Sequence, residues 1–118
     1  MNVSVMTIIW WRDIPAQVTA REGRKQSKIV LHPRFQVAID KAASRAGKRA
    51  YNDYIEEWRR TQKSCGADID AEVAAEVERL EAEYDKHRLA QLIQSGGVEG
   101  GPVFEPAKDE TQGKAVDA

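Results

Sequence analysis

The most constraining feature of the sequence is an uncharged run near its start, Val-Ser-Val-Met-Thr-Ile-Ile-Trp-Trp at residues 3–11. β-Branched and aromatic residues of this kind favour an extended strand. Apolar side chains fall on both faces of that strand, because Val5 and Ile9 alternate with Met6 and Ile8. A strand without polar alternation is usually central in its sheet and covered on both faces. We therefore expect a sheet built around residues 3–11.

The next extended segment alternates apolar and polar residues, which predicts a half-exposed strand at residues 16–22. Its polar face carries Gln17, Thr19 and Arg21. Pro15 separates this strand from the first, because proline cannot donate to a strand ladder. A basic turn follows, and residues 28–31 are a candidate short third strand. We expect the first two strands to pair antiparallel.

Two helices are predicted after these strands. Pro33 suits a first helical position, and apolar residues recur at helical spacing up to Gly47, which can end the helix. Asn52 can cap a second helix over residues 52–63. We expect helices 33–47 and 52–63 to cover the sheet, because so small a sheet is stable only with a helical cover.

A long acidic helix is predicted over residues 68–93. Its apolar stripe has helical spacing from Ile69 to Tyr84 and then stops. We therefore expect the helix either to bend near residues 85–88 or to pack its end against something different.

The predicted fold class is a small α+β protein. It has a two- to three-stranded antiparallel sheet at residues 3–31 covered by two helices, a long C-terminal acidic helix and a disordered tail. The predicted boundaries are 1–64 for the α+β domain, 65–94 for the acidic amphipathic helix and 95–118 for the tail. The tail contains 5 Gly and 2 Pro among 24 residues and few apolar groups, so it cannot bury enough surface to offset its ordering entropy.

The net charge of −1 conceals an uneven distribution. Residues 1–64 hold 13 basic and 6 acidic side chains, whereas residues 65–118 hold 5 basic and 13 acidic ones. Such asymmetry suggests a surface that faces a polyanion, an acidic tail or internal pairing. Nine of the basic residues lie between residues 21 and 49, where they could attract a phosphate-rich partner.

Six of these basic residues are candidates for binding an anion or a protein partner: Arg24, Lys25, Arg34, Lys41, Arg45 and Lys48. The last four share a narrow stripe on the helix 33–47 and its end, about 120° around the axis from the apolar stripe. A solvated face, or one paired with the acidic helix, is the simpler alternative.

The end of the first strand supplies four further candidates: Trp10, Trp11, Arg12 and Asp13. The two adjacent tryptophans must face opposite ways on a strand, so one can belong to the core and the other to a second layer or an interface. The side-by-side guanidinium and carboxylate either stabilise the turn or form an anion-holding corner.

Several classes of site are not expected. The single Cys65 cannot form an intramolecular disulfide, and with the scattered His32 and His87 it gives no metal-ligand cluster. We find no nucleophile elbow, phosphate loop or other catalytic motif, so we predict no catalytic residues, metal or cofactor. No apolar run approaches the roughly 20 residues of a membrane span, and no signal peptide is evident, so we expect a cytoplasmic protein without a membrane partner.

Three segments together suggest a family. Trp-Arg-Asp-Ile-Pro-Ala-Gln-Val at residues 11–18, the helix from Phe35 to Gly47, and the pattern Tyr54-x-x-x-Trp58-Arg59-Arg60 resemble the bacterial virulence factor domain family. The resemblance covers about residues 3–61. It carries no agreed catalytic residues. It implies a partner or accessory role in folate and corrinoid one-carbon metabolism, with a methylenetetrahydrofolate-reductase-like or corrinoid methyl-transfer protein as the larger enzyme.

Three functional hypotheses follow. The first is a non-catalytic accessory or interaction protein that docks on a larger enzyme. The second is a module that binds nucleic acid or another polyanion through residues 21–49. The third is a folate- or cofactor-handling enzyme component that uses Arg12, Asp13 and the basic helix.

Overall fold

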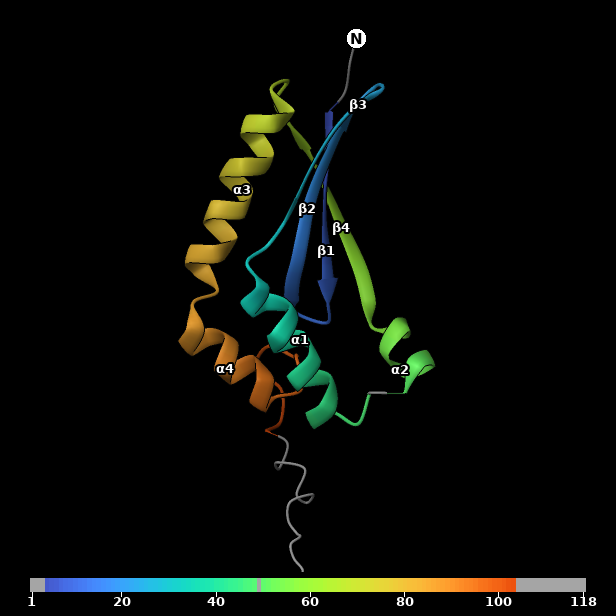
Figure 1. The fold of residues 1–118 in the computed structure, drawn as a ribbon, viewed down its shortest axis with the longest axis vertical. Helices are drawn as coiled ribbons and strands as arrows, with labels where there is room; N and C mark the ends of the chain where they lie inside the picture. The colour runs from blue at the N-terminus through green and yellow to red at the C-terminus, as the bar shows by residue number, and fades with distance from the viewer. Residues whose placement is uncertain (1–3, 49, 104–118) are drawn as a thin grey trace, which may run out of the picture.

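The protein has an α+β fold built on one antiparallel sheet, as its computed structural model describes for residues 4–48 and 50–103. Four strands lie in the order β3-β2-β1-β4 (Figure 1). Their bounds are Ser4–Trp11 for β1, Ile14–Glu22 for β2, Lys25–Val30 for β3 and Trp58–Cys65 for β4. The uncharged first strand is central, as its composition predicts, because it pairs with β2 on one side and β4 on the other.

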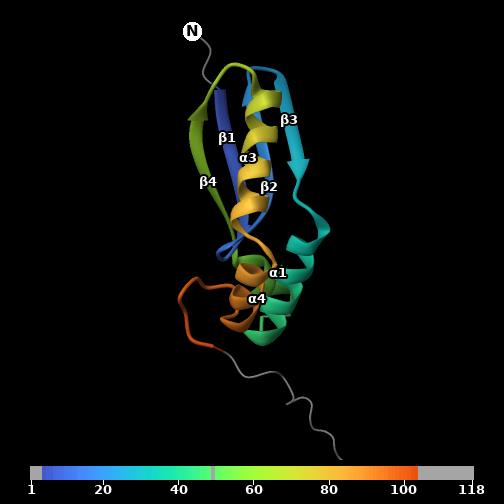
Figure 2. The ribbon, with the colours of Figure 1, turned by 90° about the vertical axis from the view of Figure 1, so that its left-hand side faces the viewer.

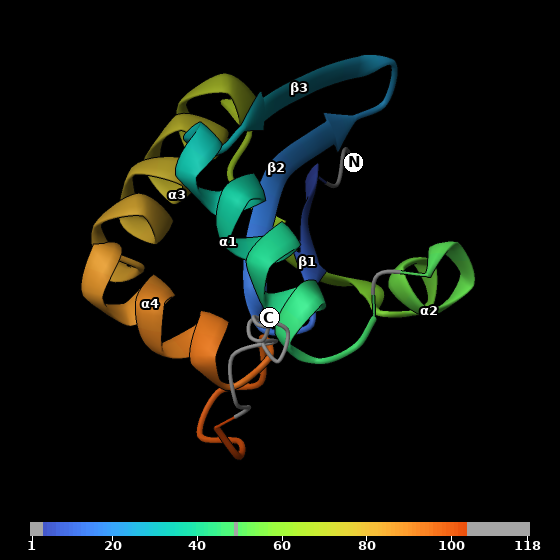
Figure 3. The same ribbon diagram turned by 60° about the horizontal axis from the view of Figure 1, so that its bottom comes forward.

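Within the described residues, four helices accompany the sheet: α1 (Pro33–Arg45), α2 (Tyr51–Glu56), α3 (Ile69–Glu83) and α4 (Lys86–Gln94). Helix α3 runs along one face of the sheet (Figures 1 and 2) and contacts β2 and β3. Helices α1 and α4 pack together beyond the end of the sheet, while α2 stands on the other side of β1 (Figure 3). A single hydrophobic core joins the inner face of the sheet to α1, α3 and α4.

Helix α1 forms as the sequence predicts. Pro33 occupies its first turn, and the His32 side chain accepts a hydrogen bond from the Arg34 backbone amide at 3.1 Å. Gly47 follows the helix with a φ of +72°, a conformation that costs glycine nothing. The buried side of α1 includes Phe35 and Ile39, which lie in the core.

The helix predicted at residues 52–63 is wrong over most of its length. Helix α2 ends at Glu56, and residues 58–65 form the fourth strand of a sheet for which two or three strands were predicted. This segment is mostly exposed and does not alternate between apolar and polar residues. It becomes a strand because the whole length of β1 offers it a backbone ladder.

The long helix predicted at residues 68–93 is divided into α3 and α4. Tyr84 leaves the helical conformation with φ −100° and ψ 69°, and the Asp85 side chain then accepts the Arg88 backbone amide at 2.9 Å to cap α4. The break explains why the apolar stripe stops at Tyr84. It lets Leu89 and Leu92 reach the core from a new direction.

The segment after α4 begins as part of the core rather than as the disordered tail predicted from residue 95. Ser95, Gly96 and Gly97 are buried, and the Asp13 backbone amide donates to the Gly97 carbonyl at 2.8 Å. Gly97 packs closely against the Trp11 side chain. The rest of the predicted tail, residues 104–118, lies outside the described residues.

Gly97→Ala is expected to destabilise the fold. Gly97 has a φ of +92°, and a Cβ there would lie 3.0 Å from Trp11 Cζ3. Backbone strain and overpacking together predict a loss of about 3 kcal/mol in the free energy of unfolding. Gly100→Ala is the matched control, because Gly100 has a φ of +70° but open space around it, and should lose only about 1 kcal/mol. Equal losses in urea unfolding would contradict a close contact with Trp11.

Candidate functional site

The face of the sheet opposite α3 is a surface that the helices leave largely open. Among the described residues, no helix runs along this face as α3 runs along the other (Figure 1). The residues of β1 on this face are Val5, Thr7 and Ile9. These three residues and those in register with them on the other strands are called the uncovered face below. The further members are Gln17, Thr19 and Arg21 on β2, Gln26, Lys28 and Val30 on β3, and Arg60, Gln62 and Ser64 on β4.

The two faces of β1 differ sharply in burial. Met6 and Ile8, which point toward α3, are 2% and 5% exposed. None of the twelve residues of the uncovered face is buried, and Val30 is 62% exposed. The expectation that the first strand is covered on both faces is therefore wrong along Val5–Ile9. Apolar side chains of a central strand remain open to solvent there.

The uncovered face carries positive charge and no negative charge. Arg21, Lys28 and Arg60 come from three different strands, and each is exposed. None of the twelve positions holds an aspartate or a glutamate. An anionic group that approached this face would meet cations without an intervening carboxylate.

Two hollows on this face adjoin each other. One, of about 540 Å³, is lined by residues that include Thr7, Thr19, Arg21 and Arg60. The other, of about 370 Å³, lies toward α1 and is lined by apolar residues that include Val30, Pro33 and Trp58. Both hollows are lined by Ile9 and Gln17, so they lie next to each other on the sheet. The two hollows together are called the trough below, with a basic end and an apolar end.

The acidic residues of α3 lie across the sheet from this trough. Glu76 is 7% exposed and pairs with Lys63 at 3.2 Å and with Arg79. Hydrogen bonds from Arg79 and Lys63 lower the pKa of Glu76 despite its partial burial. Some charges thus pair inside the molecule, whereas the cations of the uncovered face are separated from α3 by the sheet.

Arg12 is held in a corner at the end of β1. It has a φ of +54°, its Nη1 donates to the Gly96 carbonyl at 3.1 Å, and its Nε lies 3.2 Å from Glu57 Oε1. Because Arg12 and then Lys48 stabilise the charged form, the pKa of Glu57 is lowered. The guanidinium is therefore bound to groups of the protein itself.

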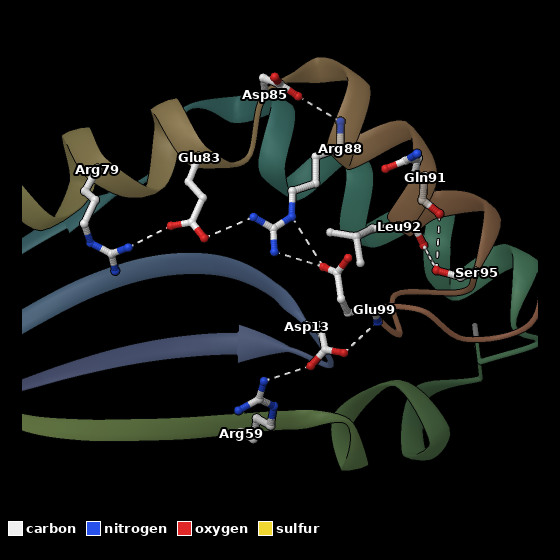
Figure 4. A network of polar contacts seen from close by, with 10 residues as sticks. All are labelled: Asp13, Arg59, Arg79, Glu83, Asp85, Arg88, Gln91, Leu92, Ser95 and Glu99. Atoms are coloured by element: carbon white, nitrogen blue, oxygen red, sulfur yellow. Dashed lines mark hydrogen bonds and ion pairs between the residues drawn. The ribbon is translucent and has the colours of Figure 1, made fainter.

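Asp13 is bound in the same corner. Its two oxygens accept from Arg59 Nη2 at 3.0 Å and from the Glu99 backbone amide at 2.7 Å (Figure 4). The Glu99 side chain in turn binds Arg88, so the corner ties β1, β4 and the start of α4 to the segment after α4 (Figure 4). Arg12 and Asp13 form a structural junction between distant parts of the chain.

The two tryptophans point to opposite sides, as their adjacency predicts. Trp11 is fully buried, stacks on Tyr54 and donates from Nε1 to the Tyr54 carbonyl at 2.9 Å. Trp10 is partly buried, meets Tyr84 edge to face and donates to Thr61 Oγ1 at 2.8 Å. Both rings are thus engaged within the fold, and neither lies on the uncovered face.

The six basic candidates do not gather at one place. Arg24 and Lys25 lie at the β2–β3 turn, far from α1 (Figure 1). Arg34 donates to the Glu81 carbonyl at 2.8 Å, and Lys48 lies 3.6 Å from a Glu57 oxygen. Lys41 is exposed beside a hollow between α1 and Tyr54, and Arg45 lies half-buried in the last turn of α1.

Arg21 and Lys28 belong to the basic segment 21–49 but are not among the individual candidates that the sequence indicates, and Arg60 lies outside that segment. The alternation of apolar and polar residues in β2 places Arg21 on the polar face of that strand. Only the pairing register of the strands shows that Lys28 and Arg60 lie on the same face of the sheet. Arg60 was missed because its segment was predicted to be a helix. The sequence does contain one signal for this face. Val5 and Ile9 lie with Thr7 on one side of the first strand, and no predicted helix is assigned to cover that side.

Other site classes find no support among residues 4–48 and 50–103. No group of three or more His, Cys, Asp or Glu side chains is placed to hold a metal ion. Burial, followed by the nearby carboxylates Glu72 and Glu22, raises the pKa of the Cys65 thiol, which disfavours the reactive thiolate. No helix in this part of the chain is both long and apolar enough to cross a membrane.

The fold and this surface define a small α+β protein with a helix-covered sheet face and an uncovered, cationic one. The family model described as "Virulence factor" matches residues 9–93, which is most of the chain. The chain therefore belongs to the virulence factor family, and the match extends past the residues 3–61 that carry the resemblance. Searches of curated proteins and of solved structures gave no match.

Glu76→Gln is expected to weaken the fold in a pH-dependent way. The folded pKa of Glu76 lies below its ordinary value of 4.5, so its stabilisation is present above pH 4.5 and is lost as the pH falls through the folded value. The variant should lose about 1 kcal/mol in the free energy of unfolding at pH 7. That difference should shrink at pH 3.

Urea unfolding at both pH values measures this difference. Glu78→Gln is the matched control, because Glu78 is an exposed residue of the same helix, and should change the free energy by less than about 0.5 kcal/mol. A difference between wild type and Glu76→Gln that is constant with pH would contradict the charged pair.

Proposed function

We propose that the protein is a non-catalytic interaction protein that docks on a larger protein through the uncovered face. One observation carries this proposal: the central strand has apolar side chains on both faces, but helices cover only one of them. Exposed apolar groups on a regular surface, rimmed by polar ones, are typical of protein interfaces. A partner seated on this face would complete the layer that the chain lacks.

The edge of the sheet offers a poorer docking site than its face. Strand β4 is one edge, and it carries Arg59, Arg60 and Lys63. Charged side chains on an edge strand oppose the addition of another strand. This argument favours a partner that packs on the face of the sheet rather than one that adds a strand to its edge.

The corner at Arg12 and Asp13 supports a non-catalytic role. Both side chains are bound to groups of the protein, and the Arg12 side chain is only 16% exposed. A folate- or cofactor-handling component that used these residues would have to break the Glu57 and Arg59 contacts first. These contacts therefore favour the interaction protein over the enzyme component as the proposed function.

The family resemblance extends the proposal to a partner in one-carbon metabolism. Under this proposal the larger protein is a methylenetetrahydrofolate-reductase-like or corrinoid methyl-transfer enzyme. The chain would act as its accessory subunit.

Thr19→Glu is expected to abolish docking. Thr19 lies in the middle row of the uncovered face, between Thr7 and Lys28, so a glutamate there adds bulk and charge at the centre of the contact. Tagged wild-type protein purified from its native host should retain a partner that the variant loses. Thermal melting of both proteins shows whether the variant is folded.

Ala75→Glu is the matched control, because Ala75 is exposed on α3, across the sheet from the uncovered face. It should retain the partner. Recovery of wild-type protein only as a free monomer, or equal retention by both variants, would contradict docking through this face.

Nucleic acid is a second candidate partner, favoured by the three cations and the absence of carboxylates on the uncovered face. This alternative predicts that affinity for a mixed-sequence RNA falls steeply with salt concentration and drops further on Lys28→Glu. Charge reversal at Arg45 and Lys48 should also weaken binding if the whole segment 21–49 takes part. Absence of binding at low salt would eliminate this candidate.

A further inference from the structure

We infer that the partner presents an extended acidic peptide segment with an apolar side chain at one end, and that this segment lies in the trough of the uncovered face. The inference rests on the proposed docking function and names the chemistry of what is docked. It follows from the shape of the trough, its apolar end and the charges at its basic end.

The trough suits an extended chain. Its basic end is lined by residues of all four strands and spans β1 from Val5 to Ile9, a distance of about 13 Å at roughly 3.3 Å per residue. The apolar hollow beyond Ile9 lengthens it further. A segment of about six to eight extended residues would fill this length, whereas a helix rises only about 1.5 Å per residue.

The apolar end of the trough has the character of an anchor pocket. Val30 on β3 is 62% exposed there and lies near Pro33 at the start of α1, while the half-buried ring of Trp58 lines the hollow from β4. Tyr54 meets the Trp58 ring edge to face and holds it in position. A leucine- or phenylalanine-sized side chain could remove these groups from water without reorganising the fold.

The other end of the trough can bind carboxylates. Arg21 and Arg60 come from strands on either side of β1, and Lys28 lies one strand further out. Between them lie Thr7 and Gln62, whose side chains form a hydrogen bond of 3.3 Å and retain capacity for others. Alternating acidic residues of an extended peptide would point toward these cations from one side of its backbone.

An acidic peptide fits the trough better than a nucleic acid or a second copy of the chain. Proteins that bind single-stranded nucleic acid on a sheet stack its bases on aromatic rings. Among the described residues that line the trough, Trp58 at the apolar end is the only aromatic one. The acidic face of α3 from a second copy would give a head-to-tail contact that does not close into a dimer.

The test is a titration of the full chain with a fluorescein-labelled peptide, Leu-Thr-Glu-Thr-Glu-Thr-Asp, blocked at both ends. We expect saturable binding, with amide chemical-shift changes in ¹⁵N spectra confined to β1, β2, β3, β4 and the first turn of α1. Lys28→Glu and Arg60→Glu should each weaken binding about threefold, and together about tenfold. Lys86→Glu, on the exposed start of α4, is the matched control and should leave affinity unchanged.

Two further peptides test the two ends of the trough. Replacing the acidic residues by Gln and Asn should weaken binding about as much as the double variant does. Replacing Leu by Ser should weaken it by about tenfold and remove the shift changes near Val30. Equal affinity for all three peptides would overturn the inference.

Other outcomes would overturn it as well. Tighter binding of a twelve-residue oligothymidine than of the acidic peptide would assign the trough to nucleic acid. Sedimentation that shows self-association blocked by Lys28→Glu would assign it to a second copy. Shift changes centred on the hollow beside Lys41 would place the peptide elsewhere.

The inference and the docking function can fail separately. Loss of the host partner from Thr19→Glu, without binding of the acidic peptide, would overturn the peptide class and retain docking on the uncovered face. Retention of the host partner by Thr19→Glu would contradict docking there, whatever the peptide does.

Discussion

The pairing of β1 with β4 is the contact on which the rest of the structure depends. It joins segments about fifty residues apart and extends over all eight residues of β1. The ladder makes β1 a central strand. It places Arg60 beside Ile9 and Gln62 beside Thr7, so it builds half of the uncovered face. It also sets Trp58 beside Trp11, where the corner begins.

The same pairing marks the limit of what the sequence could predict. Helix α1 was predictable because proline, apolar spacing and glycine all indicate the same element within thirteen residues. The first strand was predictable because its uncharged run of β-branched and aromatic residues favours an extended conformation. Strand β4 was not, because its residues are mostly polar and form helices readily. Only the ladder that β1 offers makes them a strand, and that partner is remote in sequence.

For the candidate site, too, the sequence predicts the local feature but not its partners from distant elements. A guanidinium beside a carboxylate at a strand end indicates either a turn or an anion site, and the residues between 11 and 18 cannot decide. The partners that hold these two side chains are Glu57, Gly96, Arg59 and Glu99, which come from distant parts of the chain and could not be inferred from that segment. The break after Tyr84 was easier to foresee, since an apolar stripe cannot stop in a helix without a change of direction or of neighbour.

The sheet separates the acidic and basic groups of the two halves of the chain in space. Helix α3 holds its carboxylates over one face, and Lys63 and Arg79 neutralise the most buried of them. The cations of the uncovered face lie on the other side, where none of its twelve described positions holds a carboxylate. A nearly neutral protein thus presents an acidic side and a basic side. An acidic segment is repelled by the first and attracted by the second, so the charge pattern would orient a partner before any apolar contact forms.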